Sequence, residues 1–182
     1  MNSQKLYQFM NRFLILDRDG ILNKDIGFIH EPDKILIPEG IVECLLYFSK
    51  ISYRFVVVTN QSGVARGLFN LAQLQNFHHH LQKMYFGKGI WIEDFFYCPH
   101  LPQITGECLC RKPKSLLVEK AIAKYKIDTS KSYMIGDNPR DVTAGKKAGL
   151  ATILIHQEPH SDADYHFQTI LEWYEAIKSW NF

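Results

Sequence analysis

The stretch FLILDRDGILN, from Phe13 to Asn23, places four consecutive apolar residues before two aspartates that stand one residue apart. Such an apolar run is typical of a buried strand, and open α/β sheets bind their ligands beside the carboxyl ends of the strands. Two carboxylates in that position, Asp17 and Asp19, repel each other unless a cation or a shared proton offsets their charge. The stretch therefore indicates a buried strand that ends at a site with a positively charged partner.

Strand-like runs alternate with helical patterns along the rest of the chain. We expect strands at 13–16, 55–58, 94–97, 133–135 and 151–155, and helices at 41–49, 71–85, 115–126, 140–148 and 170–180. Continuous apolar strands separated by helices favour an α/β fold, a parallel sheet with helices on both faces. The chain has 182 residues and no linker-like stretch, so we expect one domain over residues 1–182. Residues 1–12 are expected to form an N-terminal arm or a short helix.

Composition and charge argue against several classes of protein. The formal net charge of +2 is too small to indicate nucleic acid or a membrane surface as the partner. No apolar run approaches the roughly 20 residues of a membrane span, and the first residues lack a signal-peptide core. We therefore expect a cytoplasmic protein that works as a monomer on a small molecule.

Polar residues directly follow three of the expected strands. Asp17 and Asp19 follow the first strand, Thr59 and Asn60 the second, and Asp137 the fourth. Parallel strands end at the same edge of a sheet, so these side chains should converge there. Loops are polar in any protein, but acids after two different strands, one pair of them in DRDG, indicate a functional site.

These residue types suit the hydrolysis of a phosphate monoester. Asp17 would attack phosphorus and form an aspartyl-phosphate, while Asp19 would protonate the leaving oxygen and later activate water. Asp17 and Asp137 would supply oxygen ligands for Mg²⁺, which would offset the clustered charge and neutralise phosphoryl oxygens. The phosphoryl group would be bound by hydrogen-bond donors and a cation, namely Thr59, Asn60 and Lys112.

Four segments resemble a known family. LDRDGILN, VVVTNQSGVARG, CRKPK and MIGDNPRD resemble, in this order, the motifs of the haloacid dehalogenase (HAD) superfamily of phosphatases, and the resemblance covers roughly residues 13–155. It implies a Rossmann-like HAD fold in which Asp17 is the nucleophile and Asp19 the general acid and base. It also implies Mg²⁺ held by the side chains of Asp17 and Asp137 and the backbone carbonyl of Asp19. The phosphoryl group would be held by Thr59 and Lys112, with Asn60 and Arg111 nearby.

Two branches of the superfamily share these motifs. DRDG, TNQSG, CPH and CRKP resemble the D-glycero-D-manno-heptose 1,7-bisphosphate phosphatases of lipopolysaccharide precursor synthesis and the related histidinol-phosphatases of histidine biosynthesis. TNQSGVARG and DIGFIHEPD resemble the heptose branch, whereas the short loop 100–108 and the missing glycine after RKP resemble the histidinol branch. We expect cleavage of the heptose bisphosphate at the 7-phosphate, because Arg66 and Arg111, with Lys114 further out, offer cations for a second phosphate. Three acids keep histidinol phosphate as the alternative, namely Asp25, Glu31 and Asp33.

A cluster of thiols stands between the second and third motif regions. Within 13 positions the sequence holds Cys98, His100, Cys108 and Cys110. In a reducing compartment such a cluster favours a metal over a disulfide, and three thiolates with one imidazole complete a tetrahedral zinc site without an open position. The resemblance supports zinc, because these phosphatases carry a zinc loop here; a disulfide or free thiols are the alternative. Residues 98–110 lead into Arg111 and Lys112, so we expect a structural zinc that fixes their approach.

Other features have simpler interpretations. The run 78–80 of three histidines is expected to lie on a solvated helix face, because consecutive residues point around a helix. Asp141 would either support the metal site or favour a helix N-terminus through its charge. Packing residues are expected at Cys44, Trp173 and Trp180.

Two other functions are compatible with the same fold. A phospho-acceptor domain also uses acids at strand ends, but it needs no second acid in the position of Asp19. A non-catalytic binding module is disfavoured because all four motif residues are present. No large insertion follows Asp19 or the second strand. We therefore expect no large cap domain and an open site for a small phosphorylated metabolite.

Overall fold

The computed structural model describes residues 11–160 and 162–179. Its strands are β1 (Phe13–Leu16), β2 (Arg54–Asn60), β3 (Ile92–Cys98), β4 (Tyr133–Gly136), β5 (Ala151–Ile155) and β6 (Tyr165–Phe167). Its α-helices are α2 (Ile41–Lys50), α3 (Leu71–Phe86), α4 (Pro102–Thr105), α5 (Leu116–Tyr125), α6 (Pro139–Lys147) and α7 (Ile170–Ile177). Two short 3-10 helices are η1 (Pro32–Lys34) and η2 (Thr129–Lys131). The expected N-terminal arm, apart from its last two residues, and Trp180 lie outside the described residues.

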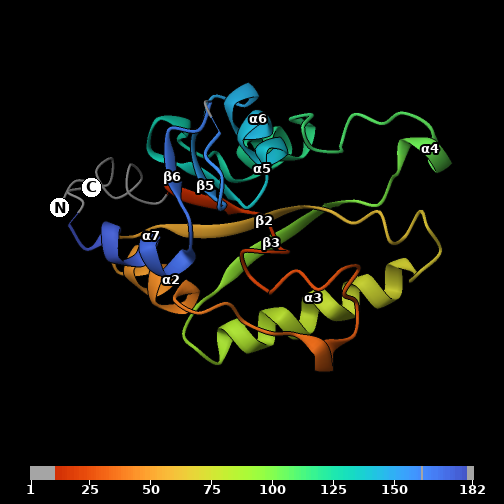
Figure 1. The fold of residues 1–182 in the computed structure, drawn as a ribbon, viewed down its shortest axis with the longest axis horizontal. Coiled ribbons are helices and arrows are strands. Elements are labelled where there is room, and N and C mark those ends of the chain that lie inside the picture. Colours follow the sequence, from red (N-terminus) through yellow and green to blue (C-terminus); the bar gives the residue numbers. More distant parts are fainter. Residues whose placement is uncertain (1–10, 161, 180–182) are drawn as a thin grey trace.

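One parallel sheet organises the molecule, with the strand order β3-β2-β1-β4-β5-β6 (Figure 1). β1 lies between β2 and β4, and its last residue, Leu16, pairs with Val57 on one side and Ile135 on the other. The carboxyl ends of the three strands that precede the expected site residues are therefore neighbours. The sheet confirms the expected α/β architecture.

Helices cover both faces of the sheet (Figure 1). Side chains along β1 alternate between the two faces, and all four are fully buried. Leu14 and Leu16 pack into one core cluster, and Phe13 and Ile15 pack into the other, so both faces need to be covered. The first cluster is shared with α2, α3 and α7, and the second with α5 and α6. Trp173 of α7 is fully buried in the first cluster, as expected of a packing residue, and so is Cys44 of α2.

Several strands differ from the sequence-based expectation. β3 spans Ile92–Cys98 where 94–97 was expected, and β4 continues one residue further, to Gly136. β2 continues to Asn60, so Thr59 and Asn60 are the last residues of the strand and not the first residues of the loop. β6 was not expected; its three residues pair with Ile153–Ile155 of β5 at the edge of the sheet. Its sequence, YHF, is partly exposed and too short to form an apolar run, so it carries no buried-strand pattern.

The segments at the carboxyl edge of the sheet hold little regular structure. In the described part of the chain, η1 is the single helix between β1 and α2, and no helix or strand lies between β2 and α3. These connections therefore add no cap domain over the edge, as expected. None of the described helices is long and apolar enough to cross a membrane.

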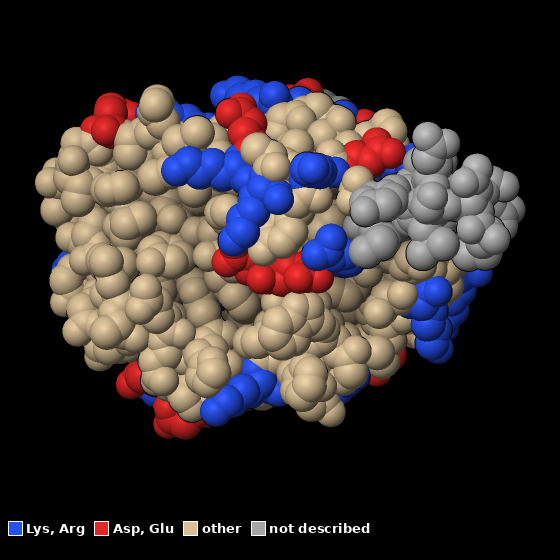
Figure 2. All heavy atoms as spheres, turned by 180° about the vertical axis from the view of Figure 1, so that it is seen from behind, with Lys and Arg blue, Asp and Glu red and all other residues tan. Residues whose placement is uncertain are grey.

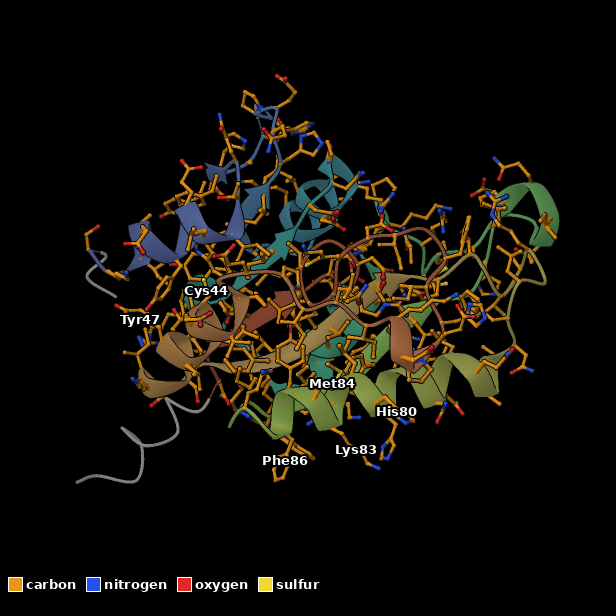
Figure 3. The ribbon with its side chains drawn as sticks, turned by 60° about the horizontal axis from the view of Figure 1, so that its bottom comes forward. Cys44, Tyr47, His80, Lys83, Met84 and Phe86 are labelled. Carbon is orange, nitrogen blue, oxygen red and sulfur yellow. The ribbon has the colours of Figure 1, made fainter. Side chains whose placement is uncertain are left out.

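Charged side chains of both signs share the surface. On the face shown in Figure 2, basic side chains gather directly above a row of acidic ones, and neither sign dominates. On the opposite side of the sheet from α5 and α6, helix α3 points His80, Lys83, Met84 and Phe86 away from the body of the protein (Figure 3). This mixed surface agrees with the small net charge of +2.

Candidate active site

Asp17 is fixed at the end of β1 by the backbone of two neighbours. Its N–H donates to the carbonyl of Ile135 in β4 (2.8 Å), and its Oδ1 accepts the N–H of Arg18 (2.7 Å). Gly20 follows with φ of +81°, and a Cβ there would lie 1.9 Å from Oδ2 of Asp137. Glycine is thus required at position 20 for two reasons. It adopts the left-handed turn, and it leaves room for Asp137, which follows β4, to approach the loop after β1.

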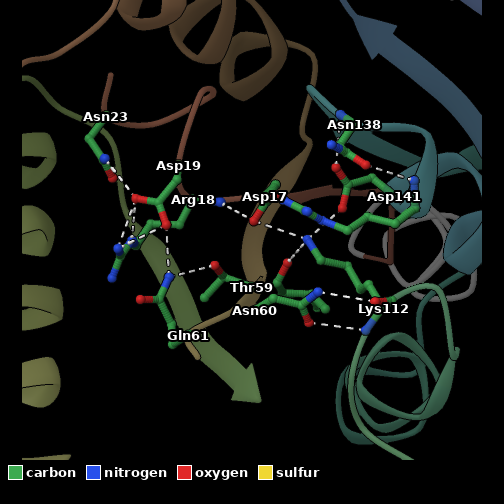
Figure 4. A network of polar contacts seen from close by, with 12 residues as sticks. Asp17, Arg18, Asp19, Asn23, Thr59, Asn60, Gln61, Lys112, Asn138 and Asp141 are labelled. Carbon is green, nitrogen blue, oxygen red and sulfur yellow. Dashed lines mark hydrogen bonds and ion pairs between the residues drawn. The ribbon is translucent and has the colours of Figure 1, made fainter. Parts of the chain in front are cut away.

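Lys112 lies beneath Asp17 and is almost fully buried (Figure 4). Its Nζ is 3.0 Å from Oδ1 of Asp17 and 2.6 Å from Oδ1 of Asp141, and it donates to the carbonyl of Val58 (2.7 Å). Burial works against the charged amine, but the carboxylates of Asp141 and Asp17 outweigh burial and raise the pKa of Lys112. The protonated amine of Lys112 therefore contacts the carboxylate of Asp17, the expected nucleophile.

The side chains at the end of β2 organise this lysine and the pocket. Asn60 accepts the backbone N–H of Lys112 (3.0 Å) and donates to its carbonyl (3.1 Å). Both atoms of the Asn60 amide are therefore used in holding the loop that carries Lys112. Thr59 is buried, and its Oγ1 accepts from Nε2 of Gln61 (2.9 Å).

Three carboxylates crowd together beside Lys112. One oxygen each from Asp17, Asp137 and Asp141 lies within 4.8 Å of the others. Burial, reinforced by the carboxylates of Asp17 and Asp141, raises the pKa of Asp137 to about 7. Burial also raises the pKa of Asp141 to about 6, although Lys112 opposes this shift. Negative charge therefore exceeds the local positive charge, and a hard divalent cation such as Mg²⁺ fits this set of oxygen ligands.

Asp141 caps a helix, as considered from the sequence, and it also lies in the acidic cluster. Its Oδ2 accepts the N–H of Asn138 (3.1 Å), while Asn138 accepts the N–H of Arg140 (3.2 Å), so the pair caps the N-terminus of α6. Its Oδ1 meets Lys112 in the acidic cluster. The start of α6 is thereby tied to the loop after β3.

Asp19 is held from three sides. Arg18 donates from Nη2 to Oδ1 (2.8 Å) and Oδ2 (2.9 Å) of its carboxylate. Asn23 donates to Oδ1 (2.9 Å) and Gln61 to Oδ2 (2.8 Å), as Figure 4 shows. The side chain remains 23% exposed and lines the same pocket as Asp17. Asp17 and Asp19 are thus separated, each with its own cation.

The expectation for the histidine run was wrong at one position. His78 is only 6% exposed, and its ring stacks on Phe95 of β3 at a centroid distance of 4.7 Å, whereas His79 is exposed. The spacing could have shown this, because His78 continues the apolar stripe of Leu74, Phe77 and Leu81 on α3.

A pocket of about 200 Å³ opens in front of these groups. Its lining includes acids, cations and one aromatic ring, namely Asp17, Asp19, Asp25, Arg111, Arg140 and Phe28. Arg140 was not anticipated from the sequence, and nothing but its place after MIGDNP marked it. The pocket is small and strongly charged, which suits a small anionic ligand.

The structure brings most of the expected site residues together. Asp17, Asp19, Thr59, Asn60 and Arg111 line the one pocket, with Lys112 and Asp137 placed against Asp17. Arg66 is exposed and lies over the ring of Phe28, which lines the pocket, 5.2 Å from the ring centroid. Lys114 is ion-paired with Glu107 at 2.7 Å, further from the pocket.

The thiol cluster, which starts at the last residue of β3, also assembles. The ligand atoms of Cys98, His100, Cys108 and Cys110 lie within 4.8 Å of one another. All four cysteines, each among the described residues, are free, and the shortest separation, 3.0 Å between Sγ of Cys98 and Cys110, is no disulfide bond. Thiolates around a tetrahedral zinc stand about 3.8 Å apart, so the cluster fits that ion. Arg111 donates to the carbonyl of His100 (3.2 Å), which links the cluster to the pocket.

The fold and this constellation are those of a HAD-like phosphatase. Residues 109–171 match the family model described as HAD-hydrolase-like. The chain is 39% identical to the D-glycero-beta-D-manno-heptose-1,7-bisphosphate 7-phosphatase of Haemophilus influenzae, over 93% of this chain and 98% of that protein. It is 33% identical to the enzyme of the same name from Escherichia coli K12, over 91% and 93%. The chain belongs to this family of phosphatases.

Solved structures agree with this assignment. A D,D-heptose 1,7-bisphosphate phosphatase from B. bronchiseptica, complexed with magnesium and phosphate, superposes with a TM-score of 0.81 at 28% identity, covering 92% of this chain and 98% of that one. A putative HAD-like phosphatase from Mesorhizobium loti superposes with a TM-score of 0.80 at 26% identity, covering 91% and 84%. The family relation therefore extends over nearly the whole described fold.

Proposed function

We propose that this protein removes the 7-phosphate of a D-glycero-D-manno-heptose 1,7-bisphosphate. The observation that carries the proposal is the pair of separated aspartates: Asp17 and Asp19 line one pocket, and each contacts a different buried cation, Lys112 and Arg18 respectively. The relatives at 33–39% identity carry this activity in their names. The pocket offers the acids and cations that hydrolysis of an anionic monoester needs.

The two aspartates have different roles in this mechanism. A carboxylate oxygen of Asp17 attacks phosphorus, the bond to the sugar oxygen breaks, and an aspartyl-phosphate forms. Asp19 gives its proton to the leaving oxygen; it then takes a proton from water, which attacks phosphorus and releases phosphate and free Asp17. Lys112 holds Asp17 in line and offsets the charge that gathers on the phosphoryl oxygens, with Thr59 donating to one of them.

Magnesium would be held by the side chains of Asp17 and Asp137, together with the backbone carbonyl of Asp19. When bound, the ion supplies the positive charge that neutralises phosphoryl oxygens and the acidic cluster. Asp141 supports the site from behind, since one of its oxygens contacts Lys112 and the other caps α6. The cluster fits this role because the carboxylates of Asp17, Asp137 and Asp141 lie close together, while Lys112 forms ion pairs with two of them, Asp17 and Asp141.

We also propose a structural zinc on the cysteine cluster and a cytoplasmic location. Zinc would close the loop that carries Arg111 and Lys112 without an open coordination position. Four free cysteines, three of them gathered with His100, suit a reducing compartment. We propose that the protein acts as a monomer.

A second phosphate on the substrate would be met by cations around the pocket. Arg140 and Arg111 line the pocket, and Arg66 lies over the ring of Phe28, another lining residue. Histidinol phosphate would instead present an amine, and Asp25, which also lines the pocket, is the observation that favours it as a second candidate.

The ratio of kcat/KM for the two substrates decides between these candidates. We expect a clear preference for the heptose bisphosphate. Arg66→Ala and Arg140→Ala identify the distal contact, because loss of a hydrogen bond to a charged group should cost about 1.5–3 kcal/mol for the bisphosphate and little for histidinol phosphate. A wild-type preference for histidinol phosphate would show that the substrate assignment is wrong.

A further inference from the structure

Arg18 stands between the two site aspartates but does not line the pocket. Its side chain has no exposed surface, and the pocket is lined by Asp17 and Asp19 on either side of it in sequence. A guanidinium out of reach of the pocket is badly placed to bind a phosphate there. A buried cation is costly unless ion pairs and hydrogen bonds satisfy it, so its partners show what it does.

One side of the Arg18 guanidinium forms an ion pair and several hydrogen bonds with the Asp19 carboxylate. Nε lies 3.1 Å and Nη2 2.8 Å from Oδ1, and Nη2 lies 2.9 Å from Oδ2. Nη2 also donates to the carbonyl of Ile29 (3.2 Å), and the group lies over the Phe77 ring, 4.6 Å from its centroid. Planar, multiply bonded arginine pairs fix the orientation of a carboxylate as well as its distance.

The other side of the guanidinium meets His78 of α3. Nη1 of Arg18 lies 3.3 Å from Nε2 of His78, sixty positions away in the chain. Arginine only donates, so Nε2 must accept, which places the ring proton on Nδ1 and leaves the imidazole neutral. Burial, together with the charge of Arg18, lowers the pKa of His78 well below its ordinary value, in agreement with a neutral ring. Stacking on Phe95 fixes the plane of that ring.

We propose that His78 and Arg18 are positioning residues for Asp19: His78 anchors the guanidinium to α3, and the guanidinium aims the Asp19 carboxylate into the pocket. This inference rests on the proposed role of Asp19 as the group that protonates the leaving oxygen. A sugar alkoxide needs that proton, whereas p-nitrophenolate is stable enough to leave without it.

The test compares His78→Leu, which removes the acceptor, with His78→Gln, which keeps one. For His78→Leu we expect kcat/KM toward heptose 1,7-bisphosphate to fall about tenfold, a part of the full contribution of a general acid. The value toward p-nitrophenyl phosphate should change less than about twofold, because kcat/KM reports only steps up to cleavage of the ester. His78→Gln should recover most of the loss, and His79→Leu, the same change on the exposed neighbour, should alter neither value.

Two results would overturn the proposal. Equal losses on both esters, or no loss on either, would show that His78 does not act through Asp19. Thermal unfolding of each variant shows whether a substitution destabilises the whole fold. If His78→Leu does so, His78→Gln alone tests the proposal, through the ratio of its kcat/KM values for heptose 1,7-bisphosphate and p-nitrophenyl phosphate. Asp19→Asn tests the proposed function independently of the role of His78. If this variant leaves the ratio of the kcat/KM values for the two esters unchanged, the role assigned to Asp19 is wrong.

Discussion

Asp17 and Asp19 are two residues apart and chemically identical, yet they meet different surroundings. Asp17 is 2% exposed and contacts the buried Lys112, whereas Asp19 keeps part of its side chain open to the pocket and is bound by Arg18. A carboxylate held rigidly against a cation suits nucleophilic attack, and one that reaches solvent suits exchange of protons with water.

Amide variants separate these roles, because asparagine keeps the shape of the side chain and removes its charge. Asp17→Asn should abolish turnover, since no nucleophile remains, and Asp19→Asn should lose about 10²–10⁴-fold in kcat. Steady-state rates with heptose 1,7-bisphosphate measure both, and Asp33→Asn, on an exposed acid, serves as the matched control. A near-normal rate in Asp17→Asn, with contaminating phosphatase excluded, is incompatible with the mechanism.

Residue-level prediction succeeded where a single segment holds the signal. The acids of DRDG and of MIGDNPRD stand directly after apolar strands, and strand-end geometry was enough to bring Asp17 and Asp137 together. The contact between Arg18 and His78 joins positions sixty apart, and no local pattern encodes it. The helical stripe on α3 reveals that His78 is buried, but not which residue it meets.

At the scale of elements, the loop from β3 to α5 connects two candidate metal sites. Its first part carries the cysteine cluster, and its last residues place Lys112 between Asp17 and Asp141. Asn60 of β2 holds the backbone of Lys112 from the other side. The end of the loop that carries Lys112 is therefore fixed by these contacts. The sequence indicated the cysteine cluster through its residue types, although it gave no sign of the edge strand β6.

Removing one thiol tests this view of the loop. Elemental analysis should find about one zinc per chain, and Cys108→Ser should lower zinc retention and reduce activity because the approach of Lys112 is no longer fixed. The unfolding temperature should fall only modestly, since the core clusters fold around other strands. Cys44→Ala, on the cysteine outside the cluster, should leave the zinc content unchanged. A metal-free protein with a disulfide between Cys98 and Cys110 under reducing conditions would contradict the zinc site.

At the scale of the whole molecule, the acidic cluster couples stability to pH and to metal. The pKa of Asp137 is raised to about 7, above the 3.8 of an unperturbed side chain. Between these values the folded protein binds more protons than the unfolded chain, so the free energy of unfolding falls as pH rises. Below about pH 4 both states are protonated, and above about pH 7 both are ionised, so the loss is confined to this window.

Magnesium should reverse this loss, because it binds the ionised carboxylates and not the protonated ones, and a ligand that binds only the folded state raises its stability. Urea unfolding with a chelator should show the free energy of unfolding decreasing from pH 5 to pH 8, and added Mg²⁺ should stabilise the protein more at pH 8 than at pH 5. Asp137→Asn removes one of the repelling charges, so without metal it should be more stable than the wild type at pH 8 and gain less from Mg²⁺, whereas Asp33→Asn should follow the wild type. A metal-free stability that does not fall through this window would contradict the raised pKa of Asp137. Equal stabilisation by Mg²⁺ at pH 5 and pH 8, unchanged in Asp137→Asn, would mean that the carboxylates of Asp17, Asp137 and Asp141 do not share one metal site.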